Sequence, residues 1–204
     1  VEVDLDASDF DAARGAHTGK PGTKAKLGSE EERKKQYTLQ ELLALGFEHI
    51  EWDGRVPIPI VDRSGRIIAV LAGQPGSDYA EELLEAFRLF LEVGKEAGLG
   101  PTAAAGPHKR GTFPAFNRGV TMGMGSPTPV AINSGFMNGV LNRLVGAEAV
   151  RRMAAYQNAA FSLWAPRVHK EYRNACNTWR EKLPHLPENF PGLSDFGAAA
   201  FNLG

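Results

Sequence analysis

The sequence has one cysteine, Cys176, and no long apolar run. One cysteine cannot form a disulfide within the chain, which excludes a disulfide-stapled secreted domain and favours a reducing compartment. No stretch approaches the ~18 apolar residues of a membrane span. The acidic N-terminal residues do not resemble a signal peptide, and no Asn-x-Ser/Thr site occurs. These absences predict an intracellular protein, nuclear or cytoplasmic, with no membrane partner.

Motifs for metal binding and catalysis are also missing. None of the five histidines lies in a His-x-Asp or His-Glu-x-x-His motif or at zinc-ligand spacing from the cysteine. No Gly-x-Ser-x-Gly elbow is present. Residues 106–112 have the outer spacing of a phosphate loop but lack its lysine. The glycines of 119–125 are more typical of a tight turn than of a ligand loop. We therefore predict no catalytic residue, metal site or cofactor site within this chain.

The net charge of -1 conceals an uneven distribution. Residues 1–100 contain 12 Lys and Arg against 19 Asp and Glu, whereas residues 101–204 contain 11 against 5. Two interpretations of the basic half stay open: a solvated helix surface, or a surface that contacts the phosphates of nucleic acid. The candidate nucleic-acid contacts are Lys109, Arg110, Arg118, Arg167, Lys170 and Arg173.

The chain divides into a charged tail and a globular part. Residues 1–36 have no apolar periodicity, so we expect a disordered tail there and a single α+β domain over 37–204. Thr38 predicts the start of a short helix that ends at Gly46. Apolar runs on both sides of the turn 62–65 predict a hairpin over residues 58–73.

Helices dominate the rest of the predicted domain. A helix from Ser77 or Asp78 to about Gly98 has its apolar residues on one face, and residues 100–125 are expected to form a loop. Further helices are expected over 133–144, over 146–164 and after Pro166, and His169 is expected on the surface of the last one. Its predicted buried face consists of Val168, Tyr172, Cys176, Trp179 and Leu183.

The final residues, 194–204, are typical of a strand that enters a sheet. A strand with nothing following it to pair with would leave backbone groups exposed, and such an edge rarely ends a domain. All four methionines are internal. We therefore interpret the chain as a piece of a longer protein.

Three stretches resemble blocks shared by a large group of proteins from mushroom-forming fungi. The first is Val61–Pro75, and the second combines Arg110–Phe113 with Gly119–Thr121. The third begins near Arg151 and is the most extensive. It keeps the group's order and spacing at Met153–Asn158, Phe161, Ala165–Pro166, Tyr172, Leu183–Pro184, Leu186, Asn189–Phe190 and Phe201–Gly204.

That fungal group resembles Fe(II)/2-oxoglutarate dioxygenases of the ten-eleven-translocation-like class, which modify nucleic acids. The resemblance implies a double-stranded β-helix in which a His-x-Asp pair and a later His bind iron and an Arg binds 2-oxoglutarate. By this resemblance the His-x-Asp pair would begin just after Gly204. The resemblance therefore implies an N-terminal fragment that is inactive alone and whose partner is the missing C-terminal half. Two alternatives stay open: a non-catalytic binding module for nucleic acid or a protein partner, and an unrelated enzyme whose site these motifs do not reveal.

Overall fold

The computed structural model describes residues 1–4, 6, 35–96, 98, 115–123 and 126–202. Helices and two small antiparallel sheets make up the described part, so the α+β class is confirmed. The chain separates into two compact units, Val1–Pro75 and Gly76–Gly204. The boundary between them falls inside residues 37–204, the stretch predicted as one domain. Most of the predicted tail, residues 7–34, lies outside the described residues, as do the candidate contacts Lys109 and Arg110.

The first unit contains the predicted short helix, α2 (Leu39–Ala44). Thr38 caps it, because its hydroxyl oxygen accepts a hydrogen bond from the backbone N–H of Glu41 at 3.2 Å. The Glu41 carboxylate accepts in return from the backbone N–H of Thr38 at 2.8 Å. This reciprocal capping box satisfies two helix-end donors, which explains why so short a helix begins where the sequence predicts it.

The predicted hairpin is confirmed as β1 (Ile58–Val61) and β2 (Ile67–Leu71). Asp62, which is fully buried, fixes the turn between them. Its carboxylate accepts hydrogen bonds from the backbone N–H groups of Ser64 and Arg66, each at 2.9 Å. Val1 and Val3 hydrogen-bond to the backbone of Val61, so the first residues of the chain lie along the outer edge of β1.

The second unit contains the helices predicted for the C-terminal two thirds of the sequence. They begin and end within a few residues of the predicted positions. Pro166 occupies the first turn of the last helix, where its missing N–H is not needed. The helices are α3 (Tyr79–Glu96), a 3₁₀ turn (Gly135–Met137), α4 (Asn138–Gly146), α5 (Glu148–Trp164) and α6 (Pro166–Lys182).

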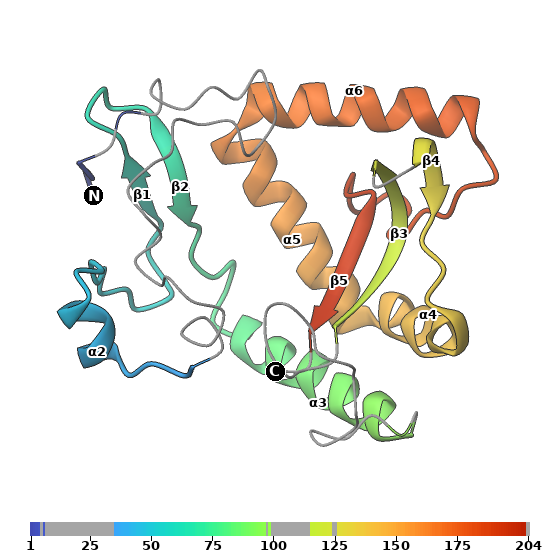
Figure 1. The fold of residues 1–204 in the computed structure, drawn as a ribbon, viewed down its shortest axis with the longest axis horizontal. Coiled ribbons are helices and arrows are strands. Elements are labelled where there is room, and N and C mark those ends of the chain that lie inside the picture. The colour runs from blue at the N-terminus through green and yellow to red at the C-terminus, as the bar shows by residue number, and fades with distance from the viewer. Residues whose placement is uncertain (5, 7–34, 97, 99–114, 124–125, 203–204) are drawn as a thin grey trace. The chain divides into compact units, whose positions relative to one another are not determined.

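A three-stranded antiparallel sheet, with the order β4-β3-β5, corrects the loop predicted for 100–125. The strands are β3 (Ala115–Gly123), β4 (Ser126–Ala131) and β5 (Ala198–Asn202). β3 and β4 were not predicted because their glycines and prolines are more typical of loops. The two prolines of β4 are nevertheless compatible with an edge strand. The predicted terminal strand is confirmed as β5, which lies beside β3 in Figure 1.

Two adjoining clusters form the core of this unit. The deeper one consists of Val93, Met137, Leu141 and Leu144, each at most 1 % exposed. The second joins α3, α4 and α5 to Phe190 in the segment that precedes β5. Phe201 of β5 packs against both clusters, so one face of the sheet is covered by the helices.

Helix α6 packs through a face that differs from the predicted one in its first turn. Val168 is 62 % exposed, whereas His169 is 5 % exposed, so the expectation of a buried Val168 and a surface His169 was wrong. Tyr172 and Cys176 face inward as predicted. Arg180, near the end of the same helix, is partly buried against Glu188 and the backbone oxygen of Asp195. His169 takes the inner position because the carboxylate of Asp195 and the ring of Phe161 both contact its side chain there.

Truncation of a core residue should separate the buried positions from the exposed ones. We expect Leu144→Ala to lower the free energy of unfolding by about 2–5 kcal/mol, as for other buried leucines. Val168→Ala should change it by less than about 0.5 kcal/mol, since that side chain is exposed. Urea unfolding of the two variants measures both values. Equal losses of unfolding free energy in the two variants would contradict the exposed position described for Val168.

Candidate functional site

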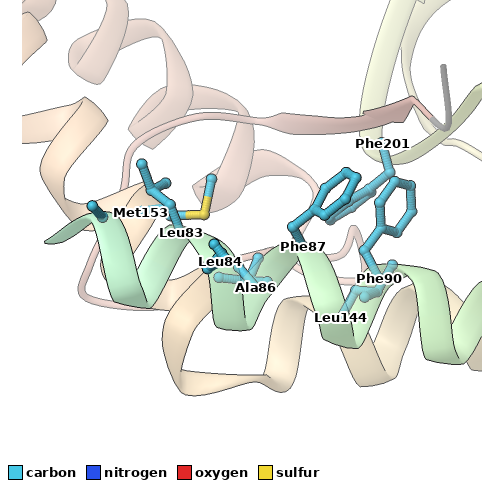
Figure 2. A pocket seen from close by; sticks show the side chains of 10 residues that line it. Leu83, Leu84, Ala86, Phe87, Phe90, Leu144, Met153 and Phe201 are labelled. Carbon is cyan, nitrogen blue, oxygen red and sulfur yellow. The ribbon is translucent and has the colours of Figure 1, made fainter. Parts of the chain in front are cut away.

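An apolar groove lies on the second unit. It has a volume of about 480 Å³ and opens along α3. Figure 2 shows the rings of Phe87, Phe90 and Phe201 at one end and Leu83 with Met153 at the other. Residues from four elements line it: Ala80, Leu83, Leu84, Ala86, Phe87, Phe90, Leu144, Val150, Met153 and Phe201.

The face of α3 that the sequence marks as apolar lies on this groove, not wholly in the core. Phe87 is 57 % exposed, Leu91 46 % and Leu84 45 %. The fully buried side of the helix runs instead through Tyr79, Ala86 and Val93. Helical periodicity shows which face of α3 is apolar. It does not show which segment, if any, packs on that face.

An ion pair joins α3 to α5. Glu82, whose side chain is 14 % exposed, binds the guanidinium of Arg152. Its second carboxylate oxygen, Oε2, is buried and has no hydrogen-bond partner in the described part of the chain. Tyr79 lies close by, and burial, then Tyr156 and Glu82, raises the pKa of its phenol. The pair therefore connects the two helices that supply most of the groove's lining residues.

Arg118 is the predicted cation that the structure places most deeply. It lies on β3 opposite Ala199 of β5, two residues after Phe116, so its side chain emerges on the helix-facing side of the sheet. Its Nε donates to Oδ1 of Asn142 on α4 at 3.0 Å, and its Nη1 donates to Oδ1 of Asn189. Burial lowers the pKa of its guanidinium. No sequence pattern marked the two asparagines as its partners.

Arg173 has a different role from the other predicted cations on α6. Its Nε donates to the Asp195 carboxylate at 2.9 Å, and His169 Nε2 lies 3.0 Å from the same oxygen. Asn158 on α5 completes the cluster, because its side-chain oxygen accepts from the backbone N–H of Asp195 at 3.2 Å. The cluster attaches the segment before β5 to both α5 and α6.

Arg167 and Lys170 are exposed on α6, away from this cluster. Helical spacing places Glu171 and Glu181 on the same outward side, so that surface carries both signs of charge. The structure therefore distributes the described candidates over three settings: a partly buried network, an ion-pair cluster and a mixed solvated surface. It does not gather them into one continuous basic patch.

The described residues do not fit an iron centre. No three His, Cys, Asp or Glu side chains among them come close enough together to hold a metal ion. Cys176 is buried and free. Within the described ranges, no helix is both long and apolar enough to cross a lipid bilayer.

Comparison with known proteins identifies no relative: no protein family, curated protein or solved structure matches this chain.

The Asp195 cluster predicts a pH-dependent contribution to stability. Burial alone would raise the pKa of Asp195, but the hydrogen bond and charge of Arg173, with Asn158 and His169, lower it below its usual value. A lowered carboxyl pKa stabilises the fold above the unfolded-state value of about 4, and the contribution is lost as the pH falls through the folded-state pKa. We expect Asp195→Asn to cost about 1–3 kcal/mol at pH 7.

Unfolding of wild type and Asp195→Asn measured between pH 7 and pH 3 tests this contribution. The difference between them should be largest near pH 7 and shrink toward pH 3. Glu85→Gln, at an exposed position on α3, is the control and should show a small difference throughout. A difference for Asp195→Asn that does not change with pH would contradict the ionic role of Asp195.

Proposed function

We propose that this chain supplies the N-terminal supporting half of an Fe(II)/2-oxoglutarate dioxygenase-like domain that acts on nucleic acid. In this proposal the helices and the sheet support a double-stranded β-helix, and other sequence provides the iron and 2-oxoglutarate ligands. The chain alone is catalytically inactive. The resemblance of residues 55–204 to the fungal dioxygenase-like group is the starting point, and the physical support comes from the surface around β5.

The open edge of β5 supports the proposal. Within the described residues β5 pairs only with β3, on one of its two edges. Its alternating burial, with Ala199 and Phe201 turned inward, is typical of a strand in a sheet with one covered face. A strand edge of this kind presents backbone N–H and C=O groups that can pair with a further strand.

The groove supplies the observation that carries the proposal most directly. Phe201 of β5 lines it, so the apolar surface adjoins the strand that has the open edge. Phe87 and Leu84 line it and are each at least 45 % exposed, and Leu91 on the same helix is 46 % exposed. A cluster of large exposed apolar side chains marks a surface that another element covers. We infer that the part of the domain that binds iron packs on this groove and continues the sheet beyond β5.

Dye binding tests the exposed surface. The chain by itself should bind a dye that fluoresces on exposed apolar surface. Phe87→Ser should bind markedly less of it, because Phe87 is the most exposed of the large apolar side chains that line the groove. Phe136→Ser is the matched control. Phe136 is 80 % exposed but lies outside the groove, so this variant should behave as wild type. Equal dye binding by all three proteins would contradict an open groove.

Iron binding tests the assignment to the dioxygenase class. The 204-residue chain should bind no chelation-resistant iron, whereas a form extended by the coding sequence after Gly204 should bind one equivalent and less of the dye. That sequence should encode a His-x-Asp within about 15 residues, the length of two or three strands. Stoichiometric iron on the unextended chain, or an extension without the motif, would contradict the proposal.

The second candidate is a non-catalytic module that binds nucleic acid. The observation in its favour is that Arg167 and Lys170 are exposed and form no ion pair within the described residues. Fluorescence anisotropy with a short duplex tests it: binding should be sequence-independent and weaken steeply with salt. Replacement of Arg167 and Lys170 by Gln should weaken it, and Arg88→Gln on α3 should not. Absence of binding at low salt would contradict this function.

A further inference from the structure

Arg118 is a partly buried cation whose described partners are all neutral. Its Nε and Nη1 donate to the side-chain oxygens of Asn142 and Asn189. No carboxylate pairs with it in the described part of the chain, although ion pairs satisfy other arginines of the same unit, including Arg143, Arg152 and Arg173. A positive charge that is taken partly out of water without a counter-charge attracts an anion.

The guanidinium is held in place by groups that are themselves fixed. Asn189 is 4 % exposed, and its amide nitrogen donates to the backbone oxygens of Arg118 at 3.1 Å and of Gly197 at 3.4 Å. These two bonds orient the amide, so its oxygen faces the guanidinium. The site therefore exists before any ligand arrives, which reduces the ordering cost of binding.

Several N–H donors of Arg118 and Asn142 remain for a ligand. Nη2 of Arg118 carries two of them, and it has no partner among the described residues. Arg118 is only partly buried, so part of its side chain is reachable by solvent. The amide nitrogen of Asn142 carries two more. Asn142 is exposed, and its oxygen is already engaged by Arg118.

We propose that Arg118 and Asn142 form a binding site for a phosphate group. A planar carboxylate binds arginine best through two parallel bonds from neighbouring nitrogens. Asn142 already occupies the N–H of Nε, so the parallel pair formed by Nε and Nη2 is no longer free, and Asn189 occupies one of the two N–H groups of Nη1. A tetrahedral phosphate can accept single bonds from Nη2 and from the Asn142 amide through different oxygens, so it suits the donors that remain. This site is independent of the proposed dioxygenase relationship.

Thermal unfolding of the full chain in inorganic phosphate tests the site. At constant ionic strength, phosphate in place of chloride should raise the unfolding midpoint of wild type in a saturable way. Acetate should raise it less. Arg118→Lys, which removes the fork of donors, should weaken phosphate binding about tenfold or more. Arg88→Lys, at an exposed position outside the site, should bind phosphate as wild type does.

Asn142→Asp keeps the test decisive if Arg118→Lys fails to fold. The substitution lies on the exposed side of α4 and places a carboxylate beside the guanidinium, so it should abolish the phosphate effect while the protein stays folded. The proposal would be overturned if phosphate did not raise the unfolding midpoint of wild type, or if acetate raised it equally. It would also be overturned if Asn142→Asp kept the rise. If the protein also binds a short duplex, and Asn142→Asp weakens that binding, nucleic acid is identified as the source of the phosphate. A response to inorganic phosphate alone would identify free phosphate.

Discussion

The pairing of β5 with β3 is the interaction on which the second unit depends, and Gly119 makes it possible. Gly119 has a φ of 122°, a left-handed backbone conformation that favours glycine. A Cβ at this position would lie 2.2 Å from the backbone oxygen of Gly197 and 2.6 Å from the amide nitrogen of Asn189. Without the side chain, β3 approaches both groups closely, and the backbone N–H of Val120 donates to Gly197 at 2.8 Å.

Two polar clusters then hold the segment that leads into β5. On one side, Asn158 and His169 contact Asp195, and the hydroxyl of Tyr172 accepts from the backbone N–H of Gly197 at 2.9 Å. On the other side, Asn189 connects the same segment to the backbone of β3. Because these groups are largely buried, each bond also avoids the cost of an unsatisfied polar group. The position of β5 is thus fixed from α5, α6 and β3 together.

Both proposed sites follow from this placement. The inward side of β5 brings Phe201 to the groove beside Phe90, with ring centroids 5.9 Å apart. The same pairing turns Arg118 of β3 toward Asn142 and Asn189. The chain therefore combines a rigid, polar, prearranged site with an apolar surface that remains open among the described residues. The first suits a small anion, and the second suits a large packed element.

Local patterns in the sequence determined the helices and the hairpin. Thr38 with Glu41, Pro166, and the turn at Asp62 each act within a few residues, so their effect is visible in the sequence alone. The α+β class and the terminal strand followed from the same local reasoning. The apolar face of α3 was also visible, because the helical repeat does not depend on what covers it.

Only the tertiary structure decided the strand character of 115–123, the burial of His169 and the partners of Arg118. β3 is stabilised by β5, about 80 residues later in the chain, and hydrogen bonds between such distant segments leave no periodic signal in a glycine-rich stretch. His169 is buried because Asp195 reaches it from another segment. Arg118 appeared in the sequence as one of several basic residues. Its two asparagine partners distinguish it, and they come from α4 and from the segment before β5, which only the folded chain brings together.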